Sequence, residues 1–438
     1  MSRCNDCEKD LVIHDLQKKL ALIKRYLAPF LWLRRLLKKT FKIIKRTNNE
    51  TGLNNTSKND ENPEKNNIDT LRTFMQGKQI RESVLYIDHG VGGGCNQYLD
   101  LHIAENTISV TYLVRYNINS GRYDINVYYD SESISFSLTT IDDVFAIINS
   151  QGIKKITLNN IISFPDTLNI LKRLIDAKKR RNIEVTMHIH DYFSVCPTFY
   201  LLDKNQNYCG PLEFKECEKC YPSSGEMIPP VLRVETGIQE WRKLWKEFLF
   251  ECDTIVVFSE SSKSILEAVY GNLPQIKIIP HTVDYIEKVD RTSKSTNTIN
   301  IGILGDVVYH KGSLILGEMV NIAADEERYS NVRFVLFGTV HPSIESNVFI
   351  ETGNYSKENL PALTIENDID IFIVPSICPE TFSYTTQEII EMNMPVACFD
   401  LGAPAERVKN YDKGLIVSET TGKCALETIV NWYDLNEI

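Results

Sequence analysis

Two successive series of apolar strand patterns and helical patterns most constrain the fold of this chain. Strands that alternate with helices indicate a parallel sheet covered by helices on both faces. In the first series, strands rich in β-branched and aromatic residues are expected at 84–88, 108–116, 125–129, 156–158, 185–189, 254–258 and 276–279. Helical patterns lie between several of them, including those at 167–179 and 243–251.

The same alternation begins again after a polar stretch at 291–297. The second series predicts strands at 299–305, 332–337, 371–374 and 396–399, and helices at 313–324 and 385–392. We therefore predict two tandem α/β domains, 77–290 and 291–438, each with a Rossmann-like, doubly wound sheet. Such sheets bind ligands at the carboxyl ends of their strands, so a site is expected in the cleft between the domains.

The first 46 residues differ sharply in charge from the rest of the chain. They hold 13 Lys and Arg against 4 Asp and Glu, a net of +9, whereas the whole chain has a net charge of −10. Apolar residues at helical spacing, interrupted at Pro29, predict a basic helical segment over 1–46. Residues 47–76 are polar and are expected to form a disordered linker.

The basic segment has two possible partners. Bulky apolar residues beside a Lys/Arg face at 11–46 predict binding to an anionic surface, the inner face of the cell membrane. The alternative is a helix that docks on a partner or on a second copy of this chain, giving a homo-oligomer. No nucleic-acid partner is expected, because the rest of the chain is acidic.

The sequence also indicates a compartment. The polar first ten residues predict no leader peptide, and the absence of an apolar run of about 18 residues predicts no spanning helix. Eleven cysteines are scattered along the chain. We expect a cytoplasmic protein, peripheral to the membrane, with thiols that are free or bound to metal rather than bridged.

Two carboxylates eight positions apart carry the strongest chemical signal. Glu380 lies on the loop after the strand at 371–374, and Glu388 lies about one turn inside the next helix. The free N–H groups and the dipole of a helix N-terminus favour a bound anion. Amides for a phosphate and carboxylates for hydroxyls together suit a nucleotide-sugar. The spacing alone also fits an N-terminal carboxylate followed by a solvated helical glutamate.

A second signal follows the first strand of the second unit. Lys311, at the end of the glycine-containing stretch 302–312, stands just before a helix. A cation in this position can meet a diphosphate that is also held by backbone amides. A surface lysine in a loop is the alternative.

On these motifs the sequence resembles retaining GT-B glycosyltransferases of family 4, and more narrowly bacterial surface-polysaccharide transferases, including rhamnosyltransferases. The matching features are the two glutamates in their Pro-Ser and Pro-Glu-Thr-Phe context, the Lys311-Gly312 pair, His190-Asp191 and the segment 279–284. The resemblance implies transfer of a sugar from a nucleotide-diphospho-sugar to a glycan or lipid-linked glycan acceptor. It also implies retention of anomeric configuration and no catalytic metal.

The resemblance assigns roles to the matching residues. Glu380 and His190 would act at the transferred sugar. The donor would be bound by Gly305, Lys311, Phe382, Ser383, Tyr384 and Glu388. In this set the amides of 382–384 would face the diphosphate, and Glu388 would take the ribose hydroxyls. The glycines Gly92, Gly93 and Gly94 would let the first domain's backbone approach the donor or acceptor, because glycine lacks a Cβ.

One residue departs from the pattern of the family. Members often have an arginine shortly after the glycine at position 305, and this chain has Asp306. An acidic residue there repels phosphate unless it faces away. Either Lys311 acts alone, or another basic residue such as Arg333 or Arg407 takes the place of the arginine.

Four cysteines within 25 residues form a third constellation. They are Cys196, Cys209, Cys217 and Cys220, and the last two are separated by a two-residue spacer. This pattern fits a tetrahedral structural zinc site without an open position for chemistry. The alternative is four free thiols in a long polar loop. His281, in an Ile-Pro-His turn, is interpreted as structural, with a catalytic role as the alternative.

Two rival functions fit parts of the sequence. The turn at 90–95 follows a strand as in dinucleotide-binding oxidoreductases, but no acidic residue ends the next strand. The other rival is a catalytically silent member of the transferase family that acts as a scaffold in a polysaccharide-assembly complex. Asp306 and the basic N-terminus fit that rival, whereas intact Glu380, Glu388 and Lys311 do not.

Overall fold

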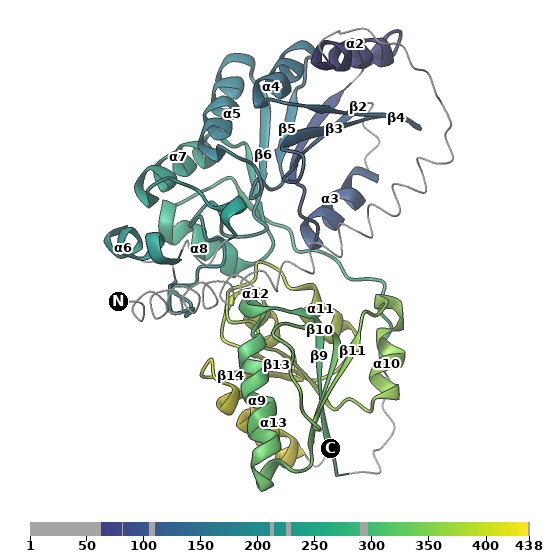
Figure 1. Ribbon diagram of the computed structural model, residues 1–438, viewed down its shortest axis with the longest axis vertical. Coiled ribbons are helices and arrows are strands. Elements are labelled where there is room, and N and C mark those ends of the chain that lie inside the picture. Colours follow the sequence, from purple (N-terminus) through teal and green to yellow (C-terminus); the bar gives the residue numbers. More distant parts are fainter. Residues whose placement is uncertain are drawn as a thin grey trace, which may run out of the picture.

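A computed structural model of the chain describes residues 63–80, 82–104, 110–210, 214–224, 229–289 and 297–436. Two lobes make up these residues, each built on its own sheet (Figure 1). The predicted basic helix at 1–46 and most of the predicted linker lie outside the described residues. No helix within the described ranges has both the length and the apolar character needed to cross a bilayer.

The first domain is built on an eight-stranded sheet in the order β4-β3-β2-β1-β5-β6-β7-β8. The strands are β1 (Ser83–His89), β2 (Val110–Asn117), β3 (Arg122–Tyr129), β4 (Glu132–Leu138), β5 (Lys155–Leu158), β6 (Glu184–His188), β7 (Thr254–Val257) and β8 (Ile276–Ile278). From β2 through β1 to β8 all neighbours are parallel, whereas β2-β3-β4 pair antiparallel. The predicted parallel sheet is therefore mixed, because short turns reverse the chain after β2 and again after β3.

Helices cover both faces of this sheet. They are α2 (Pro63–Met75), α3 (Gly94–Ala104), α4 (Ile141–Ser150), α5 (Thr167–Arg181), α6 (Phe214–Ser224), α7 (Ile238–Glu251) and α8 (Glu260–Tyr270). The alternation along β1 shows the two layers. Leu85 and Ile87 join the large core under α4, α5 and α7, whereas Val84 and Tyr86 pack with Leu99 of α3.

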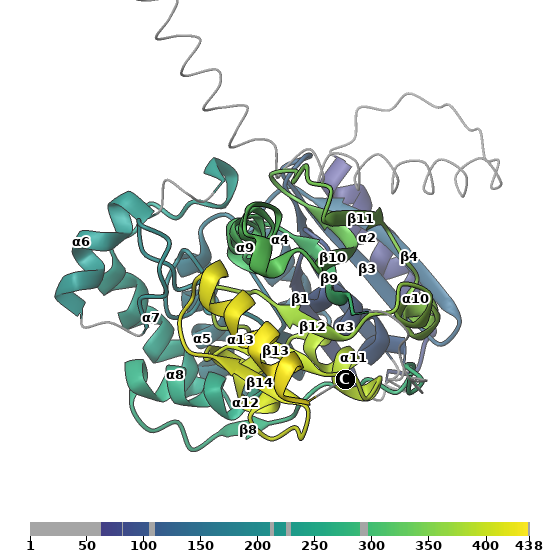
Figure 2. The same ribbon diagram turned by 90° about the horizontal axis from the view of Figure 1, so that it is seen from below.

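The second domain has a six-stranded, fully parallel sheet in the order β11-β10-β9-β12-β13-β14. Its strands are β9 (Ile299–Val307), β10 (Val332–Val340), β11 (Phe349–Gly353), β12 (Ile371–Val374), β13 (Val396–Phe399) and β14 (Gly414–Val417). Its helices are α9 (Ser313–Asp325), α10 (Leu360–Glu366), α11 (Tyr384–Glu391), α12 (Gly402–Val408) and α13 (Gly422–Asn436). Helices α9 and α13 pack on one face and α10, α11 and α12 on the other (Figure 2).

Two sequence-based predictions need correction. Residues 63–75 were assigned to the linker, yet they form α2, whose Leu71 and Met75 are buried in the core of the first domain. The polar composition hid this helix because its contact with the core comes late in the segment, from Leu71, Met75 and the partly buried Phe74. Strands β4, β11 and β14 were also missed, since all three are partly exposed strands at the edges of their sheets.

Candidate active site

Lys311 and Glu380 meet at the point where the second sheet reverses its winding. Strand β9 runs into a short 3-10 turn that ends at Lys311, and the neighbouring strand β12 runs into the loop that carries Glu380. The chain therefore places both residues beyond the carboxyl ends of adjacent parallel strands, where doubly wound sheets bind ligands. The Lys311 Nζ lies 2.8 Å from Glu380 Oε2. The sequence predicted both residues but not their contact.

A close approach of two backbones holds this pair in place. Gly312 has φ of +83°, and a Cβ at this position would lie 1.9 Å from the carbonyl oxygen of Pro375. Only glycine is compatible with both the conformation and the space. The Ile377 N–H donates to the carbonyl of His310 at 3.1 Å, which ties the two loops together from the other side.

The pair is ionised in the structure. Burial disfavours the carboxylate of Glu380, but Lys311 and a hydrogen bond from Ser376 outweigh it, and the pKa of Glu380 lies below its ordinary value. Burial likewise disfavours the ammonium, yet Glu380 raises the pKa of Lys311 above its ordinary value. Opposite charges in contact stabilise each other's charged form. A second anion brought to this point would compete with Glu380 for Lys311.

Helix α11 begins directly after the Glu380 loop. Ser383 has φ of +69° and its side chain caps the helix by accepting from the Thr386 N–H. The N–H groups of the first residues of a helix lack intrahelical acceptors. Gly305, φ +87°, lies against this end, since a Cβ there would be 3.7 Å from Thr385 Cγ2. The predicted loop 382–384 and Gly305 therefore lie together at the start of α11.

Asp306, which stands where related transferases often have an arginine, contacts the neighbouring strand β10. Asp306 is exposed, and its Oδ1 accepts from Thr339 Oγ1 at 2.8 Å. Of the two proposed substitutes for the missing arginine, Arg333 begins β10 and donates to Ser330 and Val332 carbonyls. That is the amino end of the sheet, so the proposal for Arg333 is wrong.

Arg407 lies beside the loop of the predicted donor site. Its guanidinium stands 3.9 Å from the ring centroid of Phe382 and donates to the Phe382 carbonyl. Burial lowers the pKa of Arg407 to about 10, so the group keeps its charge at neutral pH. It orders the turn of 382–384 and adds positive charge next to it.

Glu388 occupies a more enclosed position than the sequence suggested. Its side chain is 2% exposed, its Oε1 accepts from Tyr285 Oη at 2.5 Å, and the same oxygen lies 3.6 Å from Lys357 Nζ. Lys357 also lies over the rings of Tyr285 and Tyr384. A hydroxyl that reached Glu388 would have to displace these partners or share the carboxylate with them. Neither Tyr285 nor Lys357 was predicted.

In the first domain a buried amide orients His190. The loop after β5 carries Asn159, whose Nδ2 donates to Asp88 Oδ1 at 2.9 Å. A carboxylate only accepts, so this contact fixes the orientation of the Asn159 amide. Its Oδ1 then accepts from His190 Nε2 and His188 Nδ1, both at 2.9 Å. His190 therefore carries its proton on Nε2 and presents Nδ1 as an acceptor.

Asp88, at the carboxyl end of β1, anchors this network. It is fully buried and accepts from Asn96 and, at 3.3 Å, from the Arg115 guanidinium. Sequence reasoning missed Asp88 and Asn159. The sequence did offer one indication, namely their position. Both residues lie at the carboxyl ends of neighbouring parallel strands, at the edge of the sheet where ligands bind. Gly92, with φ of +88°, and Gly93, with φ of +96°, follow β1 on the same edge.

The predicted residues of the two domains come into contact. A Cβ on Gly94 would lie 3.3 Å from the Tyr384 ring, and Thr381 Oγ1 donates to the His190 carbonyl at 2.9 Å. The His281 ring stacks on Tyr384 and on Phe258, with centroids 5.1 and 4.0 Å apart. The Gly-rich turn, His190 and the 380–384 loop thus form one site between the domains, with His281 packed inside it.

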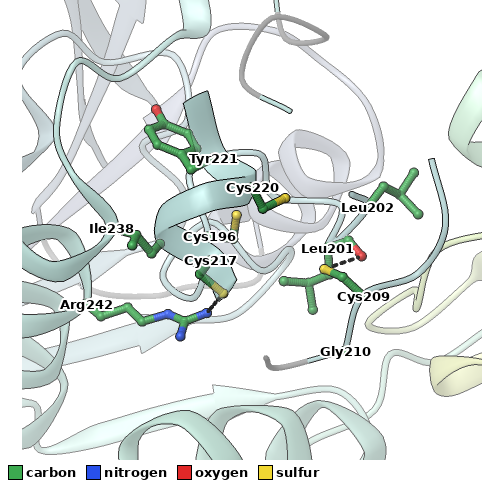
Figure 3. Close-up of a pocket in the computed structure, with 10 residues that line it drawn as sticks. All are labelled: Cys196, Leu201, Leu202, Cys209, Gly210, Cys217, Cys220, Tyr221, Ile238 and Arg242. Carbon is green, nitrogen blue, oxygen red and sulfur yellow. Dashed lines mark hydrogen bonds between the residues drawn. The ribbon is translucent and has the colours of Figure 1, made fainter. Parts of the chain in front are cut away.

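Two groups of residues carry metal-ligand chemistry. Asp88, His89 and Cys95 offer donor atoms within 4.8 Å of one another. Asp88 is already engaged as described, and His89 Nδ1 accepts from the Val91 N–H at 3.1 Å. The second group is the predicted cysteine set, whose four members line one pocket in the first domain (Figure 3).

Comparisons with solved structures identify the fold. Sucrose-phosphate synthase from Thermosynechococcus elongatus matches with a TM-score of 0.54 and 14% identity, over 81% of this chain and 90% of that one. HepE from Anabaena, solved in complex with UDP, matches with 0.51 and 13%, over 81% and 90%. A glycosyltransferase from Rickettsia africae matches with 0.51 and 15%, over 81% and 89%. No family model matches the sequence, and no curated protein does. The chain has the two-domain GT-B architecture of these structures, as the resemblance implied.

The buried imidazoles predict that stability depends on pH. Burial lowers the pKa of His281 to about 4 and that of His188 to about 3, so both are neutral in the folded protein at neutral pH. In the unfolded chain they take up protons below about pH 6.5. Stability is therefore highest above that pH and falls as the pH drops toward 4.

Urea unfolding of His281→Asn between pH 7.5 and 5 tests this. The free energy of unfolding of the variant should fall less steeply with pH than that of the unaltered protein. The control His341→Asn, outside this cluster, should keep the original slope, and an unchanged slope in His281→Asn would contradict the assignment.

Proposed function

We propose that this protein transfers a sugar from a nucleotide-diphospho-sugar to a glycan or lipid-linked glycan acceptor, with retention of anomeric configuration. The observation that carries the proposal is the contact of Lys311 with Glu380 at the switch point of the second sheet, facing His190 of the first domain. A cation and an anion meet there, close to the N-terminus of α11. In the same fold, HepE from Anabaena was solved with UDP and with UDP-glucose.

The diphosphate is proposed to bind at the start of α11. The N–H groups of Phe382, Ser383 and Tyr384 lie at and just before the N-terminus of α11, where backbone dipoles favour an anion. Lys311 lies against the same loop through Glu380. When the donor binds, a phosphate oxygen would take over part of the contact of Lys311 with Glu380. Lys311 then neutralises the charge that develops as the nucleoside diphosphate leaves.

Glu380 is proposed to act at the transferred sugar. It is ionised, held by Ser376, and 12% exposed, so it is accessible from the cleft without being loosely solvated. A fixed negative charge beside the ring stabilises the positive charge that a departing leaving group creates on the sugar. His190, with Nδ1 as an acceptor, is placed to receive a hydrogen bond from a sugar hydroxyl.

The acceptor is proposed to enter from the first domain, past Gly92 and Gly93. A growing bacterial surface polysaccharide fits the resemblance of the sequence. The basic segment 11–46 would bring the enzyme to the cytoplasmic face of the membrane, where lipid-linked glycans are made.

Vesicle flotation of the full chain tests the membrane proposal. The full chain is expected to float with anionic vesicles at low salt and to remain in solution at high salt, because exposed charges are screened. A chain that begins at residue 63 serves as the control and should not float. Equal flotation of both chains, or of neither, would contradict a role for 11–46.

The second candidate is a scaffold without activity. The observation in its favour is the enclosure of Glu388 by Tyr285 and Lys357, which covers the carboxylate that would meet the ribose. Release of nucleoside diphosphate from a panel of nucleotide-sugars separates the two candidates. An active enzyme hydrolyses or transfers from at least one donor, whereas a scaffold releases none.

Glu380→Gln should lower turnover by at least about 100-fold while the fold survives, because one positioned electrostatic group is lost. The substitution keeps the shape and removes the charge that faces Lys311. Glu391→Gln on α11 is the matched control, since Glu391 bonds only along its own helix to Gln387 among the contacts of the described chain. Turnover is measured on the donor found in the panel, with melting temperature as the check on folding. Normal turnover by folded Glu380→Gln would remove this residue from the mechanism.

A further inference from the structure

Four thiols from three separate stretches converge on one pocket of the first domain. Cys196 follows β6 and its loop, Cys209 follows a turn at 203–207, and Cys217 and Cys220 lie one turn apart on α6. Figure 3 shows the four sulfur atoms directed toward the same space, with Arg242 of α7 at its edge. The remaining lining is mostly apolar and consists of Leu201, Leu202, Gly210, Tyr221 and Ile238.

The surroundings of the pocket suit thiolates that share a cation. Arg242 Nη2 donates to Cys217 Sγ at 3.2 Å and also holds the Val195 carbonyl through Nε at 3.0 Å. Four thiolates around a divalent cation carry a net charge of −2, and the partly buried Arg242 guanidinium offsets part of it.

The loop between Cys196 and Cys209 joins the two domains. Leu201 packs in the core of the first domain, and its neighbour Leu202 packs in the core of the second. Tyr200 stacks on His310, with ring centroids 3.9 Å apart and planes at 18°. His310 precedes Lys311, so this loop supports the turn that carries the proposed phosphate ligand.

The same loop holds strained backbone. Phe199 and Leu201 have φ of +51° and +55°, the left-handed region that bulky residues rarely adopt. Residues in this conformation persist only where their surroundings impose it. Hydrogen bonds within the loop, including those from the Phe199 N–H to the Cys196 carbonyl and from the Cys209 N–H to the Leu201 carbonyl, supply part of that restraint.

We propose that Cys196, Cys209, Cys217 and Cys220 bind one structural Zn²⁺ that fixes the 196–209 loop between the two domains. Zinc takes four cysteine thiolates in closed tetrahedral sites at about 2.3 Å. No three of these sulfurs lie within 4.8 Å of one another in the described chain. The ion draws them inward, and each thiol releases its proton to solvent as it binds. Cys209 then gives up its hydrogen bond to the Leu201 carbonyl, which is 3.1 Å long.

Elemental analysis of the full chain, purified without chelator or added metal, tests the site. We expect about one zinc per chain. Cys220→Ser should lose most of the metal. Cys424→Ser changes a half-buried cysteine outside the pocket and should keep it. The double substitution Cys4→Ser and Cys7→Ser removes the other Cys-x-x-Cys pair of the sequence and should also keep it.

A second measurement needs no variant. A mercurial reagent added to the native protein should release the zinc to a colorimetric chelator as four thiols are titrated. Removing the metal should also expose the turn at 203–207 to proteolysis, because the loop loses its restraint. These readouts do not measure activity, so their outcome is independent of the proposed transferase function.

Protein from zinc-supplemented cells that contains no metal, with the four thiols freely reactive, would overturn the proposal. A disulfide between Cys217 and Cys220 in freshly purified protein would do the same. Retention of the metal by Cys220→Ser together with its loss from the Cys4 and Cys7 double variant would place the zinc elsewhere.

Discussion

The contact between the loops that follow β9 and β12 is the constraint on which the rest of the site depends. An ammonium and a carboxylate taken from water are stabilised only when they are well paired and hydrogen-bonded. Here the pairing is achieved by backbone geometry, because the missing side chain of Gly312 lets one loop lie on Pro375 of the other. The result is a lysine held beside a helix N-terminus by an anion that a phosphate could replace. Donor binding would then rearrange a contact that already exists.

The two domains are joined by specific contacts around this point. Glu406 of α12 accepts from the N–H groups of Ser261 and Glu260, at 2.8 and 3.2 Å, and so caps α8 of the other domain. Thr381, His281 and Tyr384 add contacts nearer the cleft. Such small, partly polar contacts are typical of domains that shift relative to one another. Leu202 and Tyr200, which lie on the loop between Cys196 and Cys209, form the apolar part of the junction.

The sequence predicted the alternation of strands and helices well where strands are buried on both faces. The run at 371–374 is apolar throughout and entirely buried, and it was placed correctly. Strand β4 failed because its Ser-Ile-Ser-Phe-Ser pattern is half-exposed, although its period of two was visible. In the candidate site, local motifs predicted Lys311, Glu380 and His190, which the structure brings close together. Asn159, Tyr285 and Lys357 could not be found this way, because their roles depend on which strands become neighbours and on side chains distant in sequence.

Binding of nucleoside diphosphates to the purified chain tests the central claim most directly. Titration calorimetry with a panel that includes UDP should find one that binds, and Lys311→Ala should weaken it by about tenfold or more, as for a lost charge-assisted contact. Lys409→Ala, which removes a lysine paired with Asp400 in the same domain, should bind as the unaltered protein does. Unchanged affinity in Lys311→Ala, or no binding of any diphosphate by the unaltered chain, would contradict the proposed site.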